Sequence, residues 1–178
     1  FGTSKEYYTG TGAIMSAAGS PMSGYTTEDI LPAVAAALSK SLATAGQHGQ
    51  LILRPHPSEW SQPLVDFAAV FDHPNLEITV NQRRSTSEWL AAADGVIGMM
   101  TIALLHSALI HRPTLSVQIG LNDSVEDDPC VASQLGFVPL ITDVDHLQRA
   151  CDDLVKTPEK IIIHKTMFIT ITIDSHTI

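Results

Sequence analysis

Residues 85–118, STSEWLAAADGVIGMMTIALLHSALIHRPTLSVQ, decide the fold class. A short helical pattern that begins with serine and threonine runs into the apolar segment 94–99, and a second helical pattern at 101–111 precedes the apolar segment 113–118. Short apolar runs bounded by Gly, Pro or Asp are typical of buried strands, whereas apolar residues at intervals of three and four indicate amphipathic helices. Strands that alternate with helices predict βα units and therefore a parallel sheet.

The same alternation extends in both directions along the chain. Further strands are expected at residues 13–17, 51–55, 76–80 and 139–142. Further helices are expected from Thr26 or Thr27 to about Gly46, at 60–71, near 129–135 and at 143–156. We therefore predict that residues 1–156 form a single three-layer, Rossmann-like α/β domain, with about six parallel strands between helices on both faces.

The C-terminal tail, residues 157–178, has a different character. Its segment KIIIHKTMFITITI, residues 160–173, is rich in β-branched side chains and contains no turn residue, which indicates strand. An exposed strand of this kind promotes aggregation. The tail is therefore paired in a sheet, exchanged between subunits, or foreign to the fold, and the sequence leaves these three alternatives open.

Composition excludes several classes of protein. The chain has 178 residues, with 10 Lys and Arg against 19 Asp and Glu, a net charge of −9, and 44% hydrophobic residues. Nucleic acids and anionic membranes need a basic surface, so we expect neither as a partner. No run of about 18 apolar residues predicts a membrane span. Cys130 and Cys151 lack metal-ligand spacing, so we expect buried free thiols, a cytoplasmic protein and no metal site.

Ligands of doubly wound sheets bind at the carboxyl ends of the strands, near the point where the winding reverses. The loop Gly-Ser-Pro-Met-Ser-Gly at 19–24 follows the first expected strand, and its small residues, with Ser20 among them, allow close approach to an anion. The turn Arg-Pro-His-Pro follows the second. There, Arg54 can bind a phosphate, and two prolines hold His56 in one orientation. An ordinary loop and a structural histidine remain the alternatives.

The strand that ends at Gly98 leads through Met99 and Met100 to Thr101 at the start of a helix. Free N–H groups and a hydroxyl at this point predict a seat for a pyrophosphate. His106 follows on another side of the same helix, and Gln118 ends the next strand. The chain contains no Gly-x-Ser-x-Gly, His-Glu-x-x-His, Cys-x-x-Cys or Gly-x-Gly-x-x-Gly motif, which disfavours serine hydrolases, zinc proteases and standard dinucleotide binders.

RPHPSE at 54–59 and STSEWLAAADGVIGMMTIALLHSALIHRPTLSVQIG at 85–120 together resemble a known family. They are similar to the C-terminal domain of GT-B glycosyltransferases and of the related UDP-N-acetylglucosamine 2-epimerases, over roughly residues 12–156. The resemblance implies that the domain binds a nucleotide-diphosphate sugar such as a UDP-sugar, which is a substrate and not a resident cofactor. It also implies that residues Gly98 to Thr101 meet the pyrophosphate.

Two positions depart from the family pattern. His106 stands where the family commonly has a glutamate for the ribose hydroxyls, and His111 stands where it has a small glycine. Members work in a cleft between two domains, so the resemblance also implies a missing N-terminal domain that supplies acceptor contacts. If that domain completes the cleft, His56 is expected to act in proton transfer, because its ordinary pKa is about 6.5.

The leading expectation is therefore the donor-binding domain of a glycosyltransferase or sugar-nucleotide epimerase. The alternative is a non-catalytic protein-interaction module derived from that fold, which forms a homodimer or binds a partner through residues 157–178. A third possibility, a phosphate-ester enzyme, lacks the aspartates at strand ends that a metal site would need.

Overall fold

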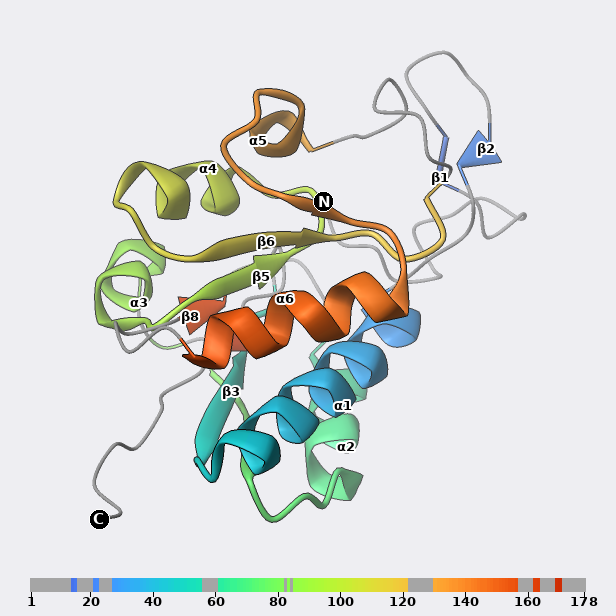
Figure 1. Cartoon of the computed structure of the whole chain (residues 1–178), viewed down its shortest axis with the longest axis vertical. Coiled ribbons are helices and arrows are strands. Elements are labelled where there is room, and N and C mark those ends of the chain that lie inside the picture. Colours follow the sequence, from blue (N-terminus) through green and yellow to red (C-terminus); the bar gives the residue numbers. More distant parts are fainter. Residues whose placement is uncertain are drawn as a thin grey trace.

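The computed structural model describes residues 14–15, 21–22, 27–55, 61–81, 83, 85–121, 130–156, 162–163 and 169–170. Its helices are α1 (Thr27–Ala45), α2 (Gln62–Val70), α3 (Thr86–Ala92), α4 (Ile102–Leu109), α5 (Val131–Gln134) and α6 (Val144–Lys156). Its strands are β1 (Ile14–Met15), β2 (Pro21–Met22), β3 (Gly49–Leu53), β4 (Leu76–Val80), β5 (Val96–Gly98), β6 (Thr114–Val117), β7 (Leu140–Ile141), β8 (Ile162–Ile163) and β9 (Ile169–Thr170) (Figure 1).

The fold is α/β with parallel strands, as the sequence predicts. β3 and β4 form one parallel pair, and β5, β6 and β7 are parallel to one another in a second sheet. The five expected strands from 51–55 onward and the six expected helices are all present, with ends that differ by a few residues. The alternation of apolar runs and helical patterns therefore identifies these elements correctly.

The prediction of one sheet of six parallel strands is wrong. In the described part of the chain, the parallel strands divide into sets of two and three, which share no strand ladder. The segment expected as the first parallel strand forms β1, which pairs antiparallel with β2 through Ile14↔Met22 and Met15↔Pro21. The tail supplies β8 and β9 instead, and β9 pairs antiparallel with β5. Pairing between distant segments decides this outcome, and local patterns do not encode it.

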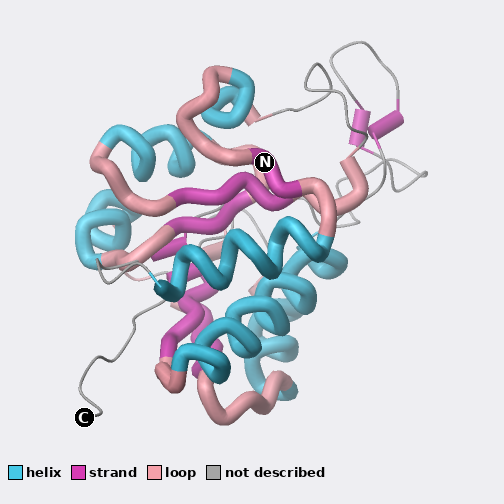
Figure 2. The backbone as a smooth tube through the Cα atoms, in the orientation of Figure 1, coloured by secondary structure: helices cyan, strands magenta, loops and turns pink. Residues whose placement is uncertain are grey.

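Helices α1 and α6 lie side by side against both sets of parallel strands (Figures 1 and 2). Gln148 on α6 donates to the carbonyl oxygen of Ala37 on α1 (3.3 Å), and Ser41 donates to Asp152 Oδ1 (2.6 Å). From the first contact to the second, the residue number rises by four on α1 and also by four on α6. The two helices therefore run in the same direction. Because α6 follows β7 and α1 leads into β3, the shared direction of the two helices means that β7 and β3 also run in the same direction. The carboxyl ends of the parallel strands therefore lie at one edge.

The strand β5 alternates between two clusters of buried side chains. Ile97 belongs to the larger core, in which Leu38 of α1 and Leu147 of α6 also lie. Val96 belongs to a smaller core with Leu104 of α4 on the opposite side. Because successive side chains of a strand point to opposite faces, helices cover both sides of β5. Figure 2 shows β5 and β6 between α3 and α4 on one side and α6 on the other.

Three helices end with a residue in the left-handed conformation. Gly46 (φ 67°) and Gly136 (φ 74°) serve this role after α1 and α5. After α4 the residue is His111, with φ 58°. The N–H groups of His111 and Arg112 donate back to carbonyls of the last turn, at 2.9 and 3.0 Å, which is the Schellman pattern. Glycine adopts this conformation without strain, so His111 occupies a position that suits a glycine.

Other properties agree with the sequence-based expectations where the structure describes them. Cys130 and Cys151 are buried free thiols. Among the described helices, none combines the length and the apolar character needed to cross a bilayer.

Candidate functional site

The candidate site lies where the winding of the chain reverses. β9 pairs with β5 and also packs against β3, so it lies between the two sets of parallel strands. From this position the chain winds outward in one direction through β3 and β4, and in the other through β5, β6 and β7. The carboxyl ends of β3 and β5 flank this reversal, which is the place where open α/β sheets bind ligands.

Arg54 directly follows β3 at this edge. Its side chain is largely buried, with 7% of its surface exposed, and its guanidinium carbon lies 5.7 Å from the ring centroid of Trp89 on α3. Burial lowers the pKa of Arg54, and the charge of Glu88 opposes this shift. A guanidinium retains its proton under these conditions, so Arg54 brings a positive charge to the carboxyl edge.

The N-terminus of α3 holds Glu88 in place beside Arg54. The backbone N–H of Ser85 donates to Glu88 Oε2 at 2.8 Å, and the N–H of Glu88 donates to Ser85 Oγ at 3.3 Å. This reciprocal capping box confirms Ser85 as the cap of the helix. The cap leaves Glu88 at the start of α3, where the helix dipole also favours a carboxylate.

The loop between β5 and α4 is held from below by a buried polar chain. Ser116 of β6 donates from Oγ to the carbonyl oxygen of Met99 at 2.7 Å, and Gln118 Nε2 donates to Ser116 Oγ at 3.0 Å. Ser116 and Gln118 have no exposed surface, and Met99 is 1% exposed. Buried polar groups need partners, so these two hydrogen bonds fix the position of the peptide that follows Met99.

The same peptide carries an N–H group at the carboxyl end of β5. In a planar trans peptide, the C=O and the following N–H point in opposite directions. The carbonyl of Met99 accepts a hydrogen bond from Ser116 on β6, so the N–H of Met100 points away from Ser116. The loop therefore presents a backbone donor next to the end of β5, the strand that flanks the reversal.

Thr101 completes this part of the site as the cap of α4. Its Oγ1 accepts a hydrogen bond from the N–H of Ala103 at 3.3 Å. A hydroxyl group that accepts in this way still carries one proton to donate. Thr101 therefore supplies a second donor beside the N–H of Met100, at the positive end of the helix dipole.

The remaining predicted residues fall into three groups. Gly98 ends β5 in register with Ser116, and Gln118 lies in the core beneath the loop. His106 is exposed in the last turn of α4, at the far end of that helix from Thr101. Ser20 and His56 lie outside the described residues.

Two residues that shape the site, Ser116 and Trp89, are not among those predicted from the sequence. Ser116 is a polar residue in a fully buried strand, and such a residue signals a specific partner. Trp89 occupies a helix that the sequence identifies, but its contact with Arg54 joins two elements that are far apart along the chain.

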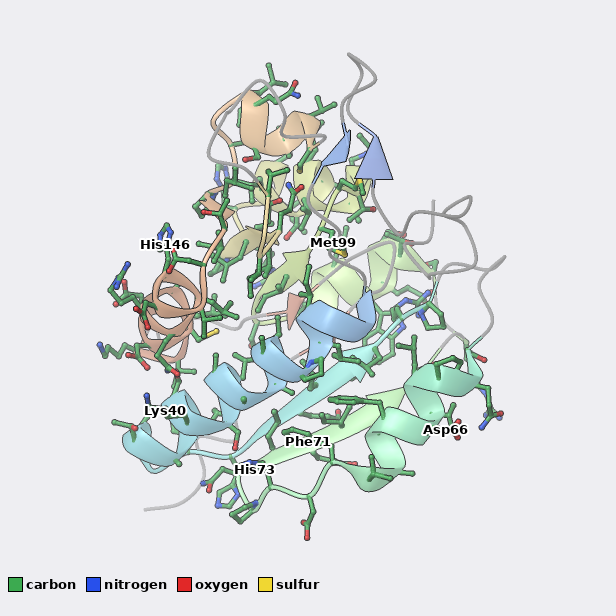
Figure 3. The ribbon with its side chains drawn as sticks, turned by 90° about the vertical axis from the view of Figure 1, so that its right-hand side faces the viewer. Lys40, Asp66, Phe71, His73, Met99 and His146 are labelled. Atoms are coloured by element: carbon green, nitrogen blue, oxygen red, sulfur yellow. The ribbon has the colours of Figure 1, made fainter. Side chains whose placement is uncertain are left out.

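A separate hollow of about 460 Å³ lies at the opposite edge of β3 and β4. Its rim includes His73, whose Nδ1 lies 2.6 Å from Ser39 Oγ and whose ring stacks on Phe71 with centroids 5.1 Å apart. Figure 3 shows His73 and Phe71 well away from Met99. These interactions engage the ring of His73, and the hollow lies apart from the carboxyl edge at which Arg54 and Thr101 lie.

Within the described ranges, no cluster of His, Cys, Asp or Glu has the composition of a metal site. The chain matches no protein-family model, and no curated protein or solved structure is significantly similar to it.

Proposed function

We propose that the carboxyl edge between β3 and β5 binds the diphosphate of a nucleotide sugar, as the donor-binding domain of a GT-B-like glycosyltransferase or sugar-nucleotide epimerase. One observation carries the proposal. The hydrogen bond from Ser116 to the Met99 carbonyl holds the peptide that carries the N–H of Met100, at the carboxyl end of β5. Thr101 follows that N–H, and Arg54 reaches the same edge from β3.

These groups form a suitable set for an anionic leaving group. The N–H of Met100 and the hydroxyl of Thr101 donate to phosphate oxygens, and the guanidinium of Arg54 supplies the charge. When the bond between the sugar and the diphosphate breaks, negative charge develops on the diphosphate. Donors that are held in place by the fold stabilise that charge without reorganising, which is where such a site gains its rate.

Other parts of the reaction remain proposals from the resemblance alone. His56 is proposed to transfer a proton, and a second domain is proposed to bind the acceptor. His106 is proposed to lie near the ribose, although its exposed place in the last turn of α4 does not favour direct contact with a phosphate at Thr101.

A second candidate function, a protein-interaction module, is favoured by a different observation. Helix α4, helix α5 that contacts it, and the turn that follows α5 carry several exposed apolar side chains. These are Ile102, Leu109, Val131, Leu135 and Phe137, each more than half exposed. Exposed apolar groups that gather on one surface are typical of interaction sites.

Thermal denaturation with millimolar UDP, CDP, GDP, ADP and their sugars tests the first proposal. A ligand at 100 times its dissociation constant adds about 2.7 kcal/mol to the free energy of unfolding. For a domain of this size, that corresponds to a rise in Tm of roughly 5–11 °C. We expect a selective rise with one base, and a Kd at least about tenfold weaker in Arg54→Gln, a loss of about 1.4 kcal/mol.

Thr101→Val is the second variant, because it keeps the shape of the side chain and removes the hydroxyl. A matched control is Thr114→Val, which removes a buried hydroxyl at the amino end of β6. The proposal is wrong if no nucleotide raises Tm and calorimetry detects no binding, or if Arg54→Gln and Thr101→Val bind like the parent protein.

A further inference from the structure

The solvent-facing side of α4 is apolar, which is unusual for a helix at the surface. Residues spaced by four and by seven lie on one side of a helix, so positions 102, 106 and 109 share a face. On this face Ile102 is 62% and Leu109 is 58% exposed, and the exposed side chain of His106 lies between them. The opposite side packs into the smaller core through Leu104. A helix that is apolar on both sides is normally covered on both.

The exposed apolar surface continues from α4 onto α5. The two helices contact each other, and Figure 1 shows them together at one end of the molecule. Of the nine large apolar side chains that are exposed in the described residues, six lie on these helices or directly after them. These six form what we call the α4–α5 surface: Ile102, Leu109, Ile110, Val131, Leu135 and Phe137.

The charge of this part of the chain differs from that of the whole. The protein has 19 Asp and Glu residues and a net charge of −9. The segments 95–122 and 129–142, which contain α4 and α5, have no Asp or Glu, and Arg112 is their single Lys or Arg. Arg112 Nη2 donates to the carbonyl oxygen of Ala91 at 2.9 Å, so the C-terminal end of α3 already engages this guanidinium.

These properties favour a second copy of this chain as the partner. A basic partner would meet no carboxylate in these segments, and an acidic partner would meet one guanidinium that is already hydrogen-bonded. A net charge far from zero keeps copies of a protein apart, and this repulsion is weakest where the contacting segments carry no carboxylates. A two-fold interface brings the same surface of each copy together, and an uncharged apolar surface is complementary to itself.

We propose that the α4–α5 surface is the two-fold interface of a homodimer. The inference rests on the second candidate function, the protein-interaction module, and names its partner. It requires no nucleotide. Because the two-fold axis repeats every contact, a single substitution on this surface perturbs the interface twice.

Analytical ultracentrifugation of the full-length chain, without nucleotide and over a range of concentrations, tests this inference. We expect a concentration-dependent species with twice the mass of one chain. Leu109→Glu and Leu135→Glu each place an unpaired carboxylate in the apolar interface and should weaken the dimer Kd at least about a hundredfold. Both side chains are more than half exposed, so each monomer should keep its fold, which circular dichroism checks.

Val70→Glu is the matched control. It makes the same change of charge at an apolar side chain that is 79% exposed, but on α2. Figure 1 shows α2 and α5 at opposite ends of the molecule. This variant should dimerise like the parent protein.

The inference is overturned if the parent protein stays monomeric at all concentrations up to about 1 mM. It is also overturned if Leu109→Glu and Leu135→Glu dimerise like the parent protein, because another surface would then form the contact. Equal loss of the dimer in Val70→Glu overturns it as well, since total charge would then control association. A flat nucleotide panel contradicts the donor-binding proposal and leaves these masses unchanged, whereas a monomeric mass leaves nucleotide binding unchanged.

Discussion

Replacing Ser116 with alanine tests the polar chain that supports the candidate site. The substitution removes the donor to the Met99 carbonyl (2.7 Å) and the acceptor for Gln118 Nε2 (3.0 Å), and it adds no atoms. Both partners are buried, so each keeps a polar group that loses a hydrogen bond in the core. Each such group costs about 1–3 kcal/mol, and relief from burying the hydroxyl offsets part of the sum.

We therefore expect Ser116→Ala to lower the free energy of unfolding by about 2–4 kcal/mol. For a domain of this size, the corresponding fall in Tm is about 4–16 °C, measured by circular dichroism or differential scanning fluorimetry. Binding should weaken as well, because the peptide after Met99 is no longer held. A lost hydrogen bond to a charged phosphate costs about 1.5–3 kcal/mol, which weakens Kd about tenfold to a hundredfold.

The control is Thr114→Val on the same strand. Thr114 Oγ1 lies 2.8 Å from Ser107 Oγ and 2.8 Å from the Arg112 carbonyl oxygen, at the amino end of β6. This variant should lose stability on a similar scale and bind nucleotide like the parent protein. A Tm of Ser116→Ala within about 1 °C of the parent would refute the stabilising role. Equal loss of binding in both variants would refute the specific role of the Met100 N–H.

Three further predictions concern other parts of the fold. His111→Gly should raise the free energy of unfolding by about 1 kcal/mol, because glycine adopts a φ of 58° without strain. Gly136→Ala, at φ 74°, should lower the free energy of unfolding by a similar amount, and urea titrations measure both changes. Burial raises the pKa of Cys151 to about 12, so its thiol should not react with Ellman's reagent at about pH 8 until the protein unfolds, and reaction in the native state would contradict this. Hydrogen bonds from Ser41 and Gln148 lower the pKa of Asp152 from its ordinary value. The ionised carboxylate therefore stabilises the folded protein above the unfolded pKa, and this contribution is lost as pH falls through the lowered folded pKa. Ser41→Ala should raise the pKa of Asp152 in a carboxyl NMR titration.

Local patterns predicted most of the fold because each helix and parallel strand carries its own signal. The amphipathic repeat of α6 and the alternation of apolar and polar residues in β4, for example, are complete within their own segments. The place of β1 could not be predicted in this way. AIMSA and the tail both have strand character, and which one pairs with β5 depends on competition between segments at opposite ends of the chain.

The sequence predicts those residues of the candidate site that directly follow the ends of strands. Arg54 and the segment from Gly98 to Thr101 follow β3 and β5, and the carboxyl edge of a parallel sheet is a general property of the fold. The support beneath these residues was not predictable, because Ser116 acts through a contact with another strand. The resemblance alone predicts a role for His106, and the structure places this exposed side chain in the last turn of α4, at the far end of the helix from Thr101.

The two buried hydroxyl groups of β6 together explain why α4 points as it does. Ser116 ties the carboxyl half of β6 to the loop that enters α4, and Thr114 ties the amino half to Ser107 within α4. A strand made only of apolar side chains would bury equal area, but it would not select one orientation of the helix, because apolar contacts have little directionality. Hydrogen bonds at both ends remove that freedom. The N-terminus of α4 is therefore directed by two side chains outside the helix, and the donors at Met100 and Thr101 inherit their positions from β6.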